Sequence, residues 1–182
     1  KVALITDGWR RLFTYAWPAG ILQRIRETGE DVNLYIFNST GNWSRDAGYN
    51  RAEYNIYNLP ELSDFDGIIL ELNNISSPAV LADVISNAKR SGRPVVSIAN
   101  ELGDFYYVGI DNYSAMKQVI AHLHEVHDCK KFWLLVGAQD NYESSCRLQG
   151  MLDYAKEHKI KIDKDDIWYG SFDYKSGLEG YK

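Results

Sequence analysis

Short apolar runs alternate with amphipathic helical segments along the whole sequence, and this alternation constrains the fold more than any other feature. Residues 2–6 form a short apolar run, as in a parallel strand that is buried on both faces. Segment 78–91 carries Val80 and Val84 on one helical face. Strands separated by helices predict βαβ units with right-handed connections and a parallel sheet. The predicted strands are 2–6, 32–37, 67–72, 95–98, 106–110, 132–137 and 167–170. The predicted helices are 18–28, 52–59, 78–91, 113–126, 142–158 and a last one from residue 174 onward.

This alternation runs through the sequence twice, once before and once after about Asp104. We therefore expect an α/β protein with two Rossmann-like lobes and parallel sheets, residues 1–104 and residues 105–182. The second lobe has only two clear strands besides the crossover strand at 106–110. A parallel sheet this small rarely stands alone, so we expect the second lobe to be truncated in this sequence.

Composition and charge exclude several classes of protein. Of the 182 residues, 45% are hydrophobic and 25% are charged, the balance of an ordinary globular protein. The net charge of −5 disfavours a nucleic-acid surface, because phosphate binding requires clustered Lys and Arg. The two cysteines, Cys129 and Cys146, give neither a disulfide framework nor a zinc spacing, and they favour a reduced, cytoplasmic location. The apolar runs are strand-sized, so we expect no membrane span.

Aromatic and planar polar residues follow the predicted strands, at the edge where open α/β sheets bind ligands. Arg147 lies one helical turn after Glu143 and can reach the same edge. Aromatic faces combined with amide, carboxylate and guanidinium groups suit a small ligand that is polyhydroxylated or heteroaromatic. The candidate ligand-binding residues are Asp7, Trp9, Phe13, Asn73, Asn141, Glu143, Arg147 and Phe172.

Each candidate also has a purely structural explanation. Arg147 and Glu143 could form only an i,i+4 ion pair on a helix surface. The aromatic candidates could pack in the core or between the lobes. The Asp and Asn candidates could cap turns or end strands.

Other chemistry is not indicated by the sequence. Segment 122–129 contains three histidines, but at about 100° per helical residue only His124 and His127 share a face, so we expect no metal site. The sequence shows no phosphate-binding glycine loop and no nucleophile–base constellation. We therefore expect neither an enzyme nor a cofactor.

Six short motifs occur in a specific order and spacing. They are Asp66-Gly-Ile-Ile-Leu70, Arg93-Pro-Val-Val-Ser97, Tyr107-Val-Gly-Ile-Asp-Asn-Tyr113, His122-Leu123, Arg147-Leu-Gln-Gly150 and Gly170-Ser-Phe-Asp-Tyr-Lys-Ser-Gly177. With these motifs the whole chain resembles the ligand-sensing domain of LacI/GalR-type transcription regulators, which share the fold of type I periplasmic sugar-binding proteins. The resemblance implies that Arg147 reaches the effector and that Phe172 lines the ligand cleft. It also implies contacts from the loop that holds Asn141 and Glu143, and an aromatic contact from Phe13.

A function follows from this resemblance. It implies the effector-binding domain of a LacI-type transcription regulator, which binds a sugar or nucleoside-like molecule, closes its two lobes around it and forms a homodimer. DNA would be contacted only through a helix-turn-helix that is absent from this chain. Two alternatives stay open, namely an extracytoplasmic solute-binding protein of a transporter and a sensor domain fused to a signalling enzyme.

Overall fold

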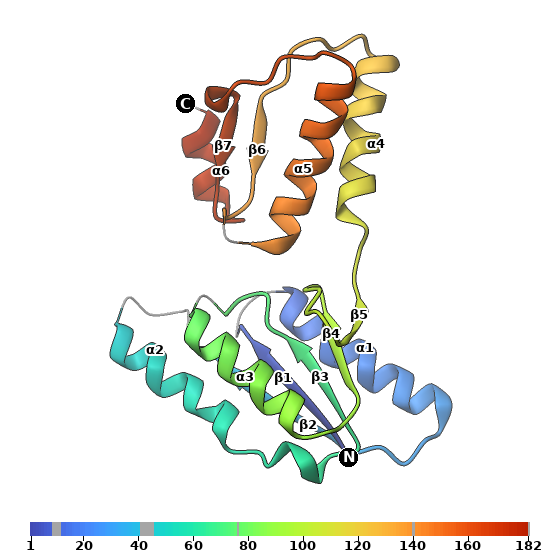
Figure 1. Cartoon of the computed structure of the whole chain (residues 1–182), viewed down its shortest axis with the longest axis vertical. Coiled ribbons are helices and arrows are strands. Elements are labelled where there is room, and N and C mark those ends of the chain that lie inside the picture. The colour runs from blue at the N-terminus through green and yellow to red at the C-terminus, as the bar shows by residue number, and fades with distance from the viewer. Residues whose placement is uncertain (9–11, 41–45, 76, 140, 182) are drawn as a thin grey trace. The chain divides into compact units, whose positions relative to one another are not determined.

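The chain forms two compact units in the computed structural model, unit 1 (Lys1–Gly109) and unit 2 (Ile110–Lys182) (Figure 1). The boundary follows Gly109 instead of residue 104, because β5 (Tyr106–Val108) pairs with β4 (Val95–Ile98) and so belongs to the sheet of unit 1. The structure describes residues 1–8, 12–40, 46–75, 77–139 and 141–181, and for residues 12–14 it describes the backbone alone.

Unit 1 is built on a five-stranded parallel sheet with the strand order β2-β1-β3-β4-β5. The central β1 (Val2–Asp7) is flanked by β2 (Leu34–Ser39) and β3 (Gly67–Glu71). Because all strands run in one direction, their carboxyl ends lie at one edge, where Asp7 and Glu71 end neighbouring strands. The predicted α/β architecture with a parallel sheet is thereby confirmed.

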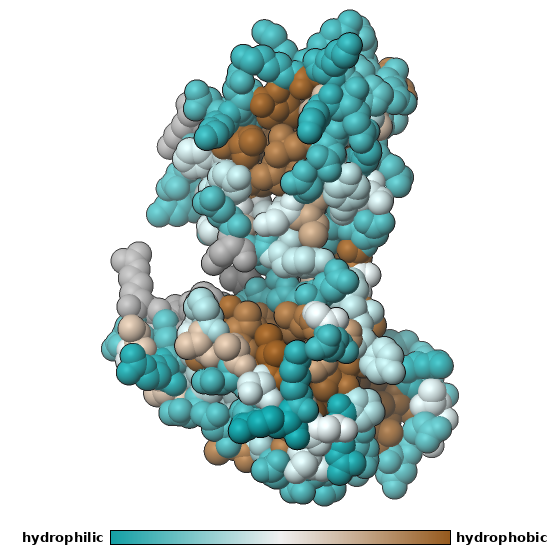
Figure 2. All heavy atoms as spheres, viewed as in Figure 1, coloured by the Kyte–Doolittle hydropathy of each residue, from teal (hydrophilic) through white to brown (hydrophobic). Residues whose placement is uncertain are grey.

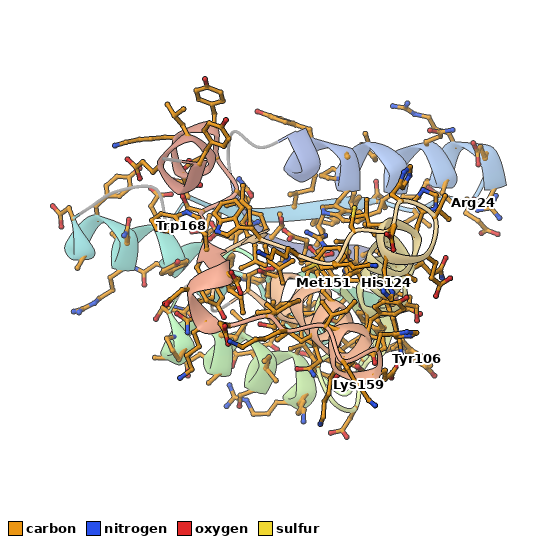
Figure 3. All side chains as sticks on the ribbon, turned by 90° about the horizontal axis from the view of Figure 1, so that it is seen from above. Arg24, Tyr106, His124, Met151, Lys159 and Trp168 are labelled. Atoms are coloured by element: carbon orange, nitrogen blue, oxygen red, sulfur yellow. The ribbon has the colours of Figure 1, made fainter. Side chains whose placement is uncertain are left out.

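Helices lie on both sides of this sheet. Its core packs with residues of α3 (Pro78–Arg90) and of two short 3₁₀ helices, η1 (Tyr54–Asn58) and η2 (Leu62–Asp64). Figure 3 shows α1 (Leu12–Thr28) on the opposite side of the strands from α3. A further helix, α2 (Ala47–Glu53), directly precedes η1. The buried core of unit 1 includes Ala3, Ile5, Tyr54, Tyr57, Leu62, Ile68, Leu70, Val84 and Ala88.

Two helices of unit 1 begin earlier than predicted. Pro18 was expected at the first position of a helix, but it lies inside α1. A proline inside a helix removes one backbone hydrogen bond without necessarily ending the helix, so the proline misled the prediction. The helix expected at 52–59 is α2 followed by η1, because Asp46 starts α2 by accepting hydrogen bonds from the Gly48 and Tyr49 amides.

In its described residues, unit 2 contains a pair of parallel strands and three α-helices. Its elements are α4 (Asn112–Glu125), β6 (Leu134–Val136), α5 (Tyr142–Glu157), a short 3₁₀ helix η3 (Lys164–Asp166), β7 (Ile167–Tyr169) and α6 (Tyr174–Tyr181). The core lies between the strands and the pair α4 and α5, as the burial of Ile120, Val136 and Met151 indicates. The predicted β–α–β order of this part of the chain is thereby confirmed.

The helices α4 and α5 cross closely at Gly150. A Cβ atom on Gly150 would overlap the backbone carbonyl of Tyr113, so this approach requires a residue without a side chain. The Tyr113 hydroxyl donates to Asp153 Oδ2 (3.0 Å), and Lys117 Nζ donates to Glu157 Oε1 (2.8 Å). These two hydrogen bonds join side chains of α4 to carboxylates of α5 and so hold the two helices together.

The strands of unit 2 also expose apolar and aromatic side chains. Leu135 and Trp168 are 49% and 40% exposed. Figure 2 shows an apolar patch over β6. In the described ranges, no helix is both long enough and apolar enough to cross a membrane.

Candidate functional site

A cavity of about 240 Å³ lies in unit 2, where β6 and β7 end. Gly137 follows β6 and Gly170 follows β7, and both line the cavity. Ligands of open parallel sheets bind at this carboxyl edge, so the cavity is the candidate site. The lining residues are Met116, Leu135, Val136, Gly137, Ser144, Arg147, Met151, Gly170, Phe172, Asp173, Ser176 and Gly177.

Among the described residues, Arg147 is the one cationic side chain in the cavity wall. Its Nε atom donates to Asn112 Oδ1 (2.7 Å), and its Nη2 atom lies 3.8 Å from Glu143 Oε1. Asn112 Nδ2 donates to the same Glu143 oxygen (3.2 Å). The Arg147 side chain is 37% exposed, so its remaining N–H groups can reach a ligand.

The start of α5 supplies two further predicted residues. Asn141 is the N-cap, and its Oδ1 atom accepts a hydrogen bond from the Ser144 amide (2.9 Å). This bond satisfies one of the amides that a helix start leaves open. Glu143 lies in the first turn, where the positive end of the helix dipole favours a carboxylate. A ligand contact of Asn141 stays a prediction, because its carbonyl oxygen already starts the helix.

Phe172 lies over the end of β6. A Cβ atom on Gly137 would overlap the Phe172 ring, so the ring occupies the space that a side chain at position 137 would fill. Phe172 has φ +59°, a left-handed conformation that is unfavourable for a bulky residue. It is 52% exposed and lines the cavity, and its contact with a ligand stays a prediction. Strain of this kind gathers at functional sites.

Asp173 brings a negative charge to the same wall. Its Oδ1 atom accepts from the Ser176 amide (2.6 Å), and its Oδ2 atom accepts from Ser171 Oγ (2.8 Å). The hydrogen bond from the Ser176 amide, followed by that from Ser171, holds the pKa of Asp173 below its ordinary value. The carboxylate is therefore ionised at neutral pH.

These groups define what the cavity can bind. The guanidinium donates, the Asp173 carboxylate accepts, and the Ser144 and Ser176 hydroxyls do both. Met151, which Figure 3 labels on α5, and the Phe172 ring add apolar surface. This combination suits a small ligand with several hydroxyl groups. In the ranges that the structure describes, no group of three or more His, Cys, Asp or Glu side chains could hold a metal ion.

The carboxyl edge of unit 1 is a buried polar network. Asp7 is 0% exposed. Thr6 Oγ1 donates to Glu71 Oε2 (2.7 Å), and the Tyr57 hydroxyl donates to the Thr6 carbonyl (2.9 Å). Burial, and then the negative charge of Asp7, raise the pKa of Tyr57 far above its ordinary value. Asp7 is therefore buried near Tyr57, and its contact with a ligand stays a prediction.

Of the other predicted residues of unit 1, one lies near this edge and two fall outside the part that the structure describes. Asn73 lies in the turn after β3, and Nδ2 of its neighbour Asn74 donates to the Asp7 carbonyl (3.0 Å). Asn74 therefore ties that turn to the end of β1. Trp9 lies outside the described residues, and so does the side chain of Phe13. Ligand contacts of Asn73, Trp9 and Phe13 stay predictions.

The histidine segment differs from its prediction. His127 Nε2 lies 3.1 Å from His122 Nε2, whereas the helical spacing had placed His127 beside His124. The prediction was wrong because α4 ends at Glu125, and the chain then turns at Asp128, which has φ +52°. His124 instead contacts the Tyr154 hydroxyl (3.1 Å).

Asn112, which was not predicted from the sequence, bonds to Arg147 in the cavity wall. A signal was present, because Asp111 and Asn112 both stand at the start of a helix, where only one cap is needed. Asp111 is the cap, since its Oδ1 atom accepts from the Ser114 amide (2.9 Å). The side chain of Asn112 is buried and bonds to Arg147 and Glu143 instead.

Comparison with solved structures identifies the fold. A transcription regulator from Lactobacillus plantarum is 18% identical with a TM-score of 0.68, over 99% of this chain and 60% of that chain. A periplasmic binding protein/LacI transcriptional regulator from Alkaliphilus metalliredigens, complexed with D-xylulofuranose, is 18% identical with a TM-score of 0.64, over 95% and 57%. The lac repressor dimer bound to operator and the anti-inducer ONPF is 13% identical with a TM-score of 0.70, over 98% and 57%. Neither a protein-family model nor a curated protein matches the sequence.

The chain therefore has the fold of the LacI-family regulators, with periplasmic-binding-protein-like architecture, as predicted. It spans about 60% of the length of the first of these structures. The structures from Lactobacillus plantarum and Alkaliphilus metalliredigens are described as transcription regulators.

Proposed function

We propose that the chain is the effector-binding part of a cytoplasmic LacI-type transcription regulator, and that its effector is a small sugar. One observation carries this proposal. The cavity at the carboxyl ends of β6 and β7 is lined by both Arg147 and Phe172, two residues for which the family resemblance implies ligand contacts. The fold supports the regulator class, and the sugar bound to the Alkaliphilus regulator supports the ligand class.

In this proposal the protein is a homodimer that signals when its two lobes close on the effector. Such closure is a shift in populations, because the effector binds the closed state more tightly than the open one. DNA is contacted through a helix-turn-helix outside these residues. The lac repressor structure is a dimer bound to its operator, and its likeness in fold supports both the proposed homodimer and the proposed DNA contact.

A thermal-shift screen against uncharged monosaccharides and nucleosides tests the proposal. A ligand that binds the native state raises the melting temperature, so at least one monosaccharide should stabilise the protein. Arg147→Ala should lower the affinity for that sugar by about 5- to 150-fold, because it removes charge-assisted hydrogen bonds. Arg24→Ala removes an exposed arginine on α1 and should leave sugar binding unchanged. Stabilisation by nucleosides alone would contradict the sugar assignment, and stabilisation by neither class would contradict the proposed function.

A further inference from the structure

The charge of Arg147 is compensated before any ligand binds. Its guanidinium lies within ion-pair distance of Glu143, 3.8 Å between Nη2 and Oε1. Asn112 connects the two residues, because it accepts from Arg147 Nε (2.7 Å) and donates to Glu143 Oε1 (3.2 Å). Asn112 is only 7% exposed, so this connection lies inside the wall of the site. Hydrogen bonds of this kind hold a planar guanidinium in one orientation.

The site carries more negative than positive charge. Asp173 is the one anionic residue among the described residues that line the cavity, and its hydrogen bonds with Ser171 and Ser176 favour the ionised form. Together with Glu143, which lies 3.8 Å from Arg147 Nη2, the described residues at the cavity carry two carboxylates and one guanidinium. A phosphate group placed here would meet a net negative field, whereas an uncharged ligand would not.

The starts of α5 and α6 do not offset this charge. A helix start ordinarily attracts anions through its open amides. Here the Ser144 amide already donates to Asn141 Oδ1, and the Ser176 amide donates to Asp173 Oδ1. The cap of α6 is itself an anion. The two helix starts therefore have fewer free amides to donate to a phosphate than uncapped helices would have.

We propose that Glu143, held by Asn112, makes the site selective for an uncharged, hydroxyl-bearing ligand over its phosphorylated counterpart. The inference rests on the proposed function, because it assigns the charge class of that effector. A hydroxyl group accepts from the guanidinium and donates to a carboxylate, so it fits a wall that offers both. Glu143 is then the residue that determines specificity, and Asn112 is a positioning residue that acts through Arg147.

Inorganic phosphate tests the charge argument without knowledge of the effector. Glu143→Gln removes the charge but keeps an oxygen that can accept from Asn112. The control is Glu157→Gln, which makes the same change on α5 at a carboxylate paired with Lys117, in the last turn of the helix. Phosphate is titrated while the NMR signal of the Arg147 Nε–H group is followed, the signal being assigned by its absence in Arg147→Lys.

Glu143→Gln should bind phosphate at least about tenfold more tightly than the wild type, and Glu157→Gln should match the wild type. Equal phosphate affinity of Glu143→Gln and the wild type would overturn the proposal. An equal gain in Glu157→Gln would also overturn it, because the effect would then reflect net charge alone.

Matched sugars test the selectivity directly. Calorimetry compares D-ribose with ribose 5-phosphate and D-fructose with fructose 6-phosphate. The uncharged member of a pair that binds should bind at least about tenfold more tightly than its phosphate, and Glu143→Gln should narrow the difference. A sugar phosphate that binds the wild type as tightly as the free sugar would overturn the proposal. If no monosaccharide binds in either form, the proposed function fails, while the phosphate titration still decides the charge argument.

The role of Asn112 is tested on the side chain that it positions. In the wild type, the Arg147 Nε–H group should exchange slowly with solvent, because it donates to Asn112. Asn112→Ala should accelerate this exchange by at least about tenfold, and Asn112→Asp, which keeps an acceptor oxygen, should restore the protection. Unchanged exchange in Asn112→Ala would show that Asn112 does not position Arg147.

Discussion

The two units use the carboxyl edges of their parallel sheets in opposite ways. In unit 1 the edge is closed, since Asp7, Ser39 and Glu71 are each no more than 3% exposed. In unit 2 the same edge opens into a cavity, where Arg147 is 37% exposed and Phe172 is 52% exposed. Both edges carry charged and polar residues directly after strands. Position after a strand therefore does not by itself identify a binding residue.

The difference lies in where the hydrogen bonds of these polar groups go. A buried polar group is costly unless the protein satisfies it internally. In unit 1, Thr6 donates to Glu71 and Tyr57 donates to the Thr6 carbonyl, so the network contributes to stability. In unit 2, the guanidinium of Arg147 has donor groups that a ligand can use. Substitutions should therefore change stability at the first edge and affinity at the second.

The largest effect is expected from Gly150→Ala, which tests the helix crossing that supports the edge of unit 2. The new Cβ atom would overlap the Tyr113 carbonyl, a backbone atom that cannot move aside easily. We expect a loss of about 3 kcal/mol in the stability of unit 2. Sugar binding should weaken too, because Asn112 on α4 and Arg147 on α5 would move apart. Hydrogen-exchange mass spectrometry reads the two units separately.

The control for this substitution is Gly20→Ala. Gly20 lies in α1, and nothing lies within 4 Å of its ideal Cβ position. The same change should therefore stabilise the protein by about 0.5–1 kcal/mol. If the hydrogen-exchange protection of unit 2 in Gly150→Ala equals that of the wild type, α4 and α5 do not approach as closely as the structure indicates.

Thr6→Val tests the closed edge of unit 1. It keeps the shape of the side chain but removes the donor to the buried Glu71 carboxylate. We expect a loss of about 2 kcal/mol in unit 1 and unchanged exchange in unit 2. Thr28→Val, at the exposed end of α1, should change stability by less than about 0.5 kcal/mol. Equal effects of the two valine substitutions would contradict the comparison between the edges.

Phe172→Asn tests the open edge of unit 2. Asparagine adopts the left-handed conformation at low cost, so stability should change by less than about 0.5 kcal/mol. Affinity for an uncharged sugar should fall by about tenfold, near 1.4 kcal/mol, because the aromatic face is lost. Phe172→Tyr keeps the ring and should keep the affinity. A large loss of stability in Phe172→Asn, measured by urea unfolding, would assign the ring to packing instead.

Much of the fold could be predicted because it depends on local patterns. The apolar runs predicted every strand of the described residues, and their alternation with helices predicted the parallel arrangement. The start of α1 could not be read, because Pro18 is a helix-start signal that the structure uses inside a helix. The short β5 was found as a strand, but only its pairing with β4 shows that it belongs to unit 1.

The site could be predicted only in part, because its contacts join distant segments. The family resemblance implied ligand contacts for Arg147 and Phe172, which both line one cavity, and these contacts stay predictions. Asn112 was missed because its role depends on the crossing of α4 with α5, which no local pattern reports. The pairing of His127 with His122 was missed for a similar reason, since it depends on a turn beyond the end of the helix.

The smallest expected effect is a change in the pKa of the Asp173 carboxyl group at the open edge of unit 2. Hydrogen bonds from the Ser176 amide and from Ser171 hold the pKa of Asp173 below its ordinary value of about 3.9, whereas burial in unit 1 raises the pKa of Tyr57. Because the pKa is lower in the folded protein, the carboxylate stabilises the start of α6 above the ordinary Asp pKa. This contribution is lost as the pH falls through the folded pKa.

The amide NMR shift of Ser176 follows this titration, and its midpoint should lie below about 3.9. Asp173→Asn should abolish the titration, because an amide does not ionise. A midpoint at or above the ordinary value would mean that the carboxylate does not hold the Ser176 amide. The start of α6 would then be an open anion site, and both the closed cap and the charge balance around Arg147 would have to be revised.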